Sequence, residues 1–127
     1  LDSSSLQFGN KYESWARFVN FMVLYNETLA KWLEQYVREN RGEDEYLSLR
    51  LMRVYKLVFL LHFYFRSFEK TSGNLKTLTR QRMVFWTEVL RSVLDDRPLS
   101  PETVLGYKRE RDSLRSAEEK RRQVELH

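Results

Sequence analysis

The chain has 127 residues, the size of one ordinary domain, and its 42% hydrophobic and 31% charged residues are typical of a folded rather than a disordered protein. The formal net charge is a modest +4, from 22 Lys and Arg against 18 Asp and Glu. Because cysteine is absent, disulfides, thiolate zinc sites and cysteine nucleophiles are excluded, and an intracellular location, cytoplasmic or nuclear, is expected.

No segment is apolar for long enough to suggest a membrane span. The longest apolar run, Leu57 to Leu61, continues past His62 to Phe65 but stays well short of the roughly 18 residues that a spanning helix needs. The sequence opens with Leu1 rather than Met and without a secretory pattern, which predicts a domain cut from a longer polypeptide or a processed chain. We expect neither a transmembrane segment nor peripheral membrane contact.

The first predicted helix covers residues 12–40. Large apolar residues recur there at alternating spacings of three and four, which predicts that they form the core face of the helix. These residues are Trp15, Phe18, Met22, Tyr25, Leu29, Trp32 and Tyr36. The opposite edge is polar and is expected to face solvent; it consists of Glu13, Asn20, Glu27 and Glu34. Asn40, Arg41 and Gly42 are typical of a helix end.

Two further helices are predicted over residues 43–70 and 75–94. The first opens with Glu43, Asp44 and Glu45, acidic residues that favour a helix N-terminus. Residues 57–65 are apolar on nearly every side, so we expect this helix to lie buried at the centre. The second is expected to end before Asp95-Asp96-Arg97-Pro98, because proline disfavours a helical conformation in the residue before it.

Ser100-Pro101-Glu102 predicts the start of a fourth helix, with a hydroxyl cap, proline at the first helical position and an acid in the first turn. From Lys108 onward this helix is mostly charged, and we expect it to fray unless a second chain covers it. The fold predicted is therefore all-α, a compact bundle of about four helices with a long charged C-terminal helix. Its expected organisation is a flexible lead-in (1–10), a helical bundle domain (11–107) and a charged helix extension (108–127).

Nothing in the sequence predicts catalysis, a cofactor or a metal site. Of the two histidines, His127 is the last residue and His62 lies in the most apolar stretch, where a lone histidine among Leu and Phe is typical of a packed core residue. The acidic run Glu43 to Glu45 is explained by the helix dipole, and three consecutive helical residues cannot all face one cation. No phosphate-binding glycine loop or nucleophile elbow is present.

The leading hypothesis is a non-catalytic helical protein–protein interaction domain, a scaffold or adaptor that binds a partner or itself through helix faces. Eighteen aromatic side chains, three of them Trp, exceed what one small bundle readily hides, so part of a helix face is expected to contact a partner. The candidate interface residues are Phe21, Leu24, Tyr107, Leu114, Ala117 and Val124.

A basic surface that binds nucleic acid is the alternative function. The residues proposed for it are Arg50, Arg53, Lys56, Lys76, Arg80 and Arg82. The short stretch from Phe18 to Glu27 resembles part of a helix in the ANTH membrane-adaptor domains. The rest of the chain departs from that pattern, and no family is assigned.

Overall fold

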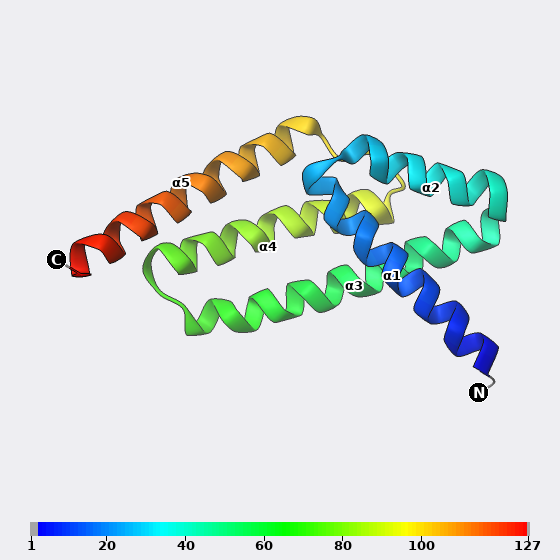
Figure 1. The fold of residues 1–127 in the computed structure, drawn as a ribbon, viewed down its shortest axis with the longest axis horizontal. Helices are drawn as coiled ribbons and strands as arrows, with labels where there is room; N and C mark the ends of the chain where they lie inside the picture. The colour runs from blue at the N-terminus through cyan, green and yellow to red at the C-terminus, as the bar shows by residue number, and fades with distance from the viewer. Residues whose placement is uncertain (1–2, 127) are drawn as a thin grey trace. The chain divides into compact units, whose positions relative to one another are not determined.

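The computed structural model describes the backbone of residues 3–126 and the side chains of residues 12–126. Its helices are α1 (Ser3–Tyr25), α2 (Glu27–Arg41), α3 (Glu43–Lys70), α4 (Gly73–Leu94) and α5 (Pro101–Leu126) (Figure 1). No strand occurs in this part of the chain, which confirms the all-α prediction, although the helices number five rather than about four. Within residues 3–126, no helix combines the length and the apolar character that crossing a membrane requires.

The additional helix arises at Asn26, where the predicted helix 12–40 divides into α1 and α2. Asn26 has φ −156° and ψ 84°, and its side-chain oxygen accepts a hydrogen bond from the Leu29 amide at 3.0 Å. Glu27 follows in the first turn of α2. An Asn cap followed by an acid is a helix-start signal, and the sequence prediction missed it because the apolar spacing continues across Asn26.

The other helix boundaries lie close to their predicted positions. Gly42 separates α2 from α3 with φ 95°, a backbone conformation that favours glycine. Helix α4 ends at Leu94 and α5 begins at Pro101, as the local signals predicted. Helix α1 begins at Ser3, so it includes most of the stretch 1–10 that was predicted to be a flexible lead-in; Leu1 and Asp2 lie outside the described residues.

The chain divides into two compact units, residues 1–58 and residues 59–127, with the boundary inside α3. This division was not predicted from the sequence. In the first unit, α1, α2 and the first part of α3 share a core. Its buried side chains are Tyr12, Ala16, Val37, Tyr46 and Leu49, with Trp15 and Met52 packed against them.

A buried polar network joins the three helices of the first unit. The Arg53 guanidinium on α3 donates to Asn20 Oδ1 on α1 at 2.7 Å and to Glu34 Oε1 on α2 at 2.7 Å, and Asn20 donates back to the Arg53 carbonyl at 3.3 Å. Arg53 is only 4% exposed, which corrects its placement on a basic surface. Asn20 is buried as well, so Asn20 and Glu34, which were predicted to face solvent, instead meet α3.

The second unit has its core between α4 and α5, which lie side by side (Figure 1). Phe85 of α4 stacks on Tyr107 of α5 with ring centroids 4.3 Å apart, and Trp86 packs edge-on against Phe85. Trp86 is buried, as predicted. The prediction that α3 is buried on every side between residues 57 and 65 is wrong, because half of its apolar and aromatic side chains there are exposed. They are Val58, Phe59, Phe63 and Phe65.

Helix α5 continues to pack on α4 beyond Lys108. Leu114 is half-buried, and Glu118 is buried and accepts a hydrogen bond from Asn74 of α4 at 3.4 Å. The following residues, 119–126, are all exposed. The middle of α5 therefore belongs to the second unit, and the fraying expected of the segment 108–127 stays a prediction.

Candidate protein-binding surface

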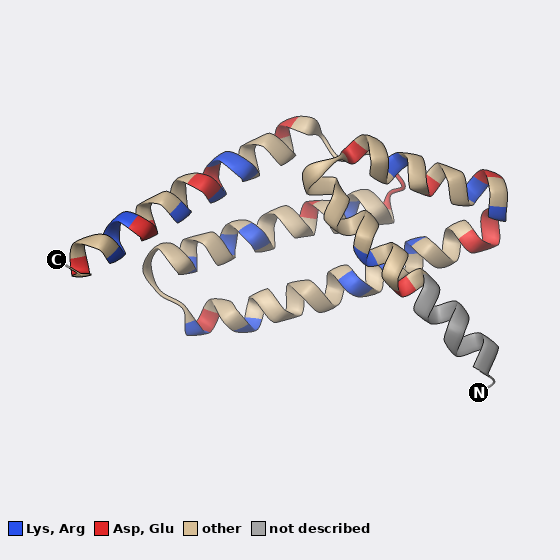
Figure 2. Cartoon of the chain, viewed as in Figure 1, with Lys and Arg blue, Asp and Glu red and all other residues tan. Residues whose placement is uncertain are grey.

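The second half of α1 presents a row of exposed aromatic side chains, which we call the α1 row: Phe18, Phe21 and Tyr25. The spacing of three and four places them on one side of the helix, away from the buried Val19 and Val23. The Phe21 and Tyr25 rings contact each other with centroids 4.9 Å apart. Residues 18–25 of α1 include no Lys, Arg, Asp or Glu, and Figure 2 draws the last turns of α1 without either charge colour.

Helix α2 presents a second row, the α2 row: Leu29, Trp32 and Tyr36. These residues have the same helical spacing and lie on the side of α2 away from the buried Ala30 and Val37. The Trp32 and Tyr36 rings stack with centroids 5.5 Å apart, yet Trp32 is 59% exposed. The seven residues predicted to form the core of the helix 12–40 include all but one of the side chains in these two rows. That prediction is therefore wrong for the exposed ones.

The two rows together leave a large apolar area in contact with water. Their side chains are between 37% and 59% exposed. Since large apolar side chains present roughly 150–250 Å² each, the exposed area is on the order of 500 Å². Monomeric proteins rarely expose contiguous apolar patches larger than a few hundred Å² except at binding sites, and Trp and Tyr are the residues most enriched among interface hot spots.

The predicted interface residues have different positions in the structure. Phe21 is exposed and belongs to the α1 row. Leu24 and Tyr107 are buried inside the first and second units, which corrects their assignment to an exposed interface. On α5, Leu114 is half-buried against α4, whereas Ala117 and Val124 are exposed. Leu29, Trp32 and Tyr36 were assigned to the core, so the sequence analysis missed the α2 row.

The structure also separates the residues predicted to form a basic surface. On α3, Lys56 is half-buried and its ammonium pairs with the Glu13 carboxylate at 2.5 Å, which holds the pKa of Glu13 below its usual range. Burial lowers the pKa of Arg53, and the Glu34 carboxylate opposes that effect. Arg50 is half-buried, with its guanidinium 5.8 Å from the centroid of the Tyr46 ring.

The α4 members of the predicted basic surface lie over aromatic rings of the second unit. Lys76 and Arg80 are 4.5 and 5.9 Å from the centroid of the Phe68 ring, and Arg82 is 5.7 Å from that of Tyr64. Such contacts orient the cations and need no nucleic acid to explain them. In Figure 2 basic and acidic residues are interspersed along α5, so this helix does not present a surface of one charge either.

The residues predicted to carry no catalytic or metal role have these positions in the structure. Among the residues that the structure describes, no group of three or more His, Cys, Asp or Glu side chains is placed to hold a metal ion. His62 is exposed on α3, which corrects its prediction as a packed core residue. Glu43 pairs with Arg38 of α2 at 2.9 Å.

No protein-family model matches the chain, and no curated protein and no solved structure is similar to it. Its function must therefore be inferred from its own surfaces.

Proposed function

We propose that this chain is a non-catalytic helical protein–protein interaction domain and that it binds through the α1 and α2 rows. The observation that carries the proposal is the exposure of six large apolar side chains on these two helices. The same unit buries polar groups, the Arg53–Asn20–Glu34 network, between its helices. Burying the Arg53 guanidinium costs desolvation free energy, and leaving Trp32 in water forgoes the free energy that burying its apolar surface would provide. A partner that covers the rows would supply that second contribution.

The occupant that fits the rows best is a second copy of the chain. Neither row contains a charged residue, so two copies can bring the rows together without placing like charges opposite each other, despite the net charge of +4. The exposed area, on the order of 500 Å² per copy, approaches the roughly 800 Å² per partner of a standard interface, and neighbouring side chains add to it. The proposed assembly is a symmetric homodimer in which each copy uses the same rows.

Nucleic-acid binding is less well supported. Of the α3 residues proposed for the basic surface, Arg53 is buried and Lys56 is paired with Glu13, so neither is available to a phosphate. Phosphate contacts would also make any association strongly dependent on salt, whereas apolar contacts between helices would not.

Sedimentation equilibrium over a range of chain concentrations tests the proposal. We expect the wild-type chain to dimerise, with little change between 50 and 500 mM salt. Phe21→Ala should weaken the dimer tenfold or more, about 1.4 kcal/mol. Phe63→Ala is the matched control, because Phe63 is a similarly exposed phenylalanine on α3 outside the rows.

Equal weakening by the two substitutions would show that the rows are not the interface. The wild-type chain could instead stay monomeric and capture a different protein only while Phe21 is intact. That result would support the interaction function but would show that the rows bind a different protein rather than a second copy. A monomeric chain whose capture of partners is unaffected by Phe21→Ala would overturn the proposal.

A further inference from the structure

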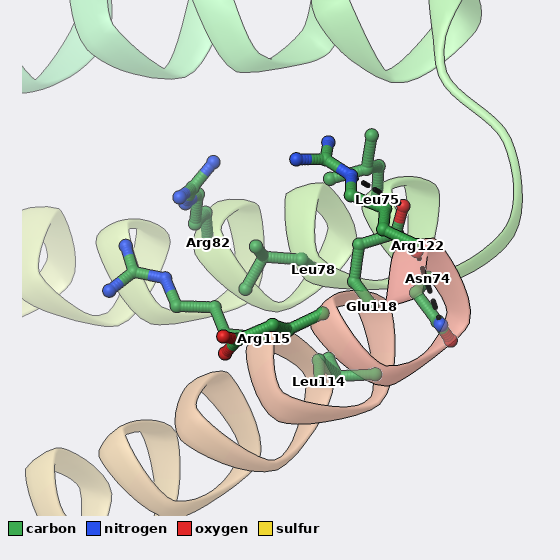
Figure 3. A pocket seen from close by; sticks show the side chains of 9 residues that line it. Asn74, Leu75, Leu78, Arg82, Leu114, Arg115, Glu118 and Arg122 are labelled. Atoms are coloured by element: carbon green, nitrogen blue, oxygen red, sulfur yellow. Dashed lines mark hydrogen bonds and ion pairs between the residues drawn. The ribbon is translucent and has the colours of Figure 1, made fainter. Parts of the chain in front are cut away.

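A cleft of about 300 Å³ lies between α4 and α5 in the second unit (Figure 3). Pockets for small ligands begin at about this volume. The α4 side contributes Asn74, Leu75, Leu78 and Arg82, and the α5 side contributes Leu114, Arg115, Glu118, Glu119 and Arg122. The cleft thus combines an apolar floor of three leucines with charged groups around it.

At one end of the cleft the charges are already neutralised. Glu118 receives hydrogen bonds from Arg121 at 2.7 and 3.1 Å and from Asn74 at 3.4 Å, and the Arg122 guanidinium lies 3.5 Å from the same carboxylate. The hydrogen bonds from Arg121, opposed by burial, lower the pKa of Glu118 to about 2. This end is a structural contact between α4 and α5 rather than an open binding group.

At the other end, Arg82 and Arg115 bring two guanidinium groups from different helices to the same side of Leu78 (Figure 3). Among the described residues, neither forms an ion pair; Arg82 only contacts the face of the Tyr64 ring. Both are close enough to influence the pKa of the Tyr64 phenol, which burial raises and the two cations lower. Two positive charges from different helices are thus held near one phenol.

We infer that this cleft binds a phosphate monoester that carries an apolar group. The Arg82 and Arg115 guanidinium groups present forked N–H donors that match phosphate oxygens, and their two charges match the dianion. Leu75, Leu78 and Leu114 form the surface that would receive the apolar group. Glu119 also lines the cleft and is exposed, so its carboxylate repels the ligand and limits the affinity.

Calorimetric titration of the full chain with phenyl phosphate tests this inference. We expect saturable binding that is at least tenfold tighter than that of benzoate, which carries one charge, or of inorganic phosphate, which lacks an apolar group. Arg82→Gln and Arg115→Gln should each weaken binding tenfold or more. Glu119→Gln should strengthen it severalfold, and this opposite effect cannot result from loss of folding.

Arg109→Gln is the control for net charge, because Arg109 is an exposed α5 arginine that does not line the cleft. Binding that Arg109→Gln weakens as much as Arg115→Gln, or that Glu119→Gln leaves unchanged, would overturn the inference. So would the absence of saturable binding to the wild-type chain.

Flotation with vesicles that contain phosphatidate distinguishes the two sources of such a group. Flotation that phenyl phosphate competes away would assign the site to a lipid headgroup. Binding of phenyl phosphate without flotation would assign it to a soluble monoester. Flotation by a chain that does not bind phenyl phosphate would contradict the cleft as the site.

Discussion

At the scale of single residues, Arg53 explains most about how the first unit is assembled. Its guanidinium is buried and donates hydrogen bonds to one side chain from each of α1 and α2. The packing of these two helices on α3 therefore depends on this one charged group. A buried ion pair adds little compared with well-packed apolar residues, but removing one member is costly because the other charge stays buried. Such a network fixes which helix faces meet.

We predict that Arg53→Ala destabilises the chain by about 3–5 kcal/mol, because Glu34 and Asn20 lose their buried partner. The free energy of unfolding from urea titration measures the loss. Arg53→Met combined with Glu34→Leu should recover part of it, since no charge then remains unpaired. Arg17, whose side chain is 73% exposed, provides the control, and Arg17→Ala should change stability by less than about 0.5 kcal/mol. A similarly small effect of Arg53→Ala would contradict the network.

Two tryptophans that the sequence treats alike have opposite environments. Trp86 is buried against Phe85, so Trp86→Ala should cost about 3–5 kcal/mol of unfolding free energy. Trp32 is exposed in the α2 row, so Trp32→Ala should cost less than about 1 kcal/mol in the monomeric chain. Urea titration at a concentration that keeps the chain monomeric measures both. If Trp32→Ala lowered the unfolding free energy as much as Trp86→Ala, Trp32 would have to be buried in a core.

Glu118 predicts a pH dependence for the second unit. Its pKa of about 2 in the folded chain lies below its ordinary value of 4.5, so the contact stabilises the fold fully above pH 4.5. That contribution is lost as the pH falls from about 5 towards 2. Melting temperatures at pH 7, 5 and 3 should therefore fall less steeply for Glu118→Gln than for the wild-type chain.

The control for this experiment is Glu110→Gln, which removes an exposed carboxylate from the same helix. Its pH profile should follow that of the wild-type chain. Identical profiles for the wild-type chain and Glu118→Gln would show that the hydrogen bonds from Arg121 and Asn74 do not persist in solution.

At the scale of helices, the sequence predicted where each helix begins and ends better than which side of the helix is buried. Local signals placed the ends of α3 and α4 and the start of α5, because caps, glycine and proline act through the backbone nearby. The faces depend on partners distant in sequence. Once Asn26 divides the first predicted helix, the apolar and polar edges of α1 and α2 are decided by what α3 offers. Arg53 and Lys56 on α3 pair with polar side chains of α1 and α2, so it is the polar sides of these helices that face α3.

The charged segment of α5 illustrates the same limit. Its composition suggested a fraying helix, but Leu114 and Glu118 find contacts on α4 that spacing within α5 cannot reveal. A chain ending at Lys108 should therefore melt at least about 4 °C lower, since a loss near 1 kcal/mol shifts a small domain by that much. Among the described residues, a chain ending at Arg122 loses only 123–126, which are exposed, and it should melt with the wild type. Equal melting of all three chains would restore the original expectation of an independent tail.

At the scale of the whole molecule, composition was sufficient to predict the all-α class and the surplus of aromatic side chains. It did not show where the surplus lies. Leu24 and Tyr107 were predicted at an interface and are buried, whereas Trp32 and Tyr36 were predicted in the core and are exposed. A helical repeat of apolar residues identifies a face but not whether that face meets its own chain or another one.

The dissociation constant of the dimer, compared between the wild-type chain and Trp32→Ala by sedimentation equilibrium, tests the central claim most directly. Trp32 is the most exposed aromatic residue of the two rows, so a second copy that covers it would lose a large contact. The account predicts a wild-type dimer and a dissociation constant at least tenfold weaker for Trp32→Ala, with the stability of the monomer lowered by less than about 1 kcal/mol. A dimer equally strong in both chains would contradict it.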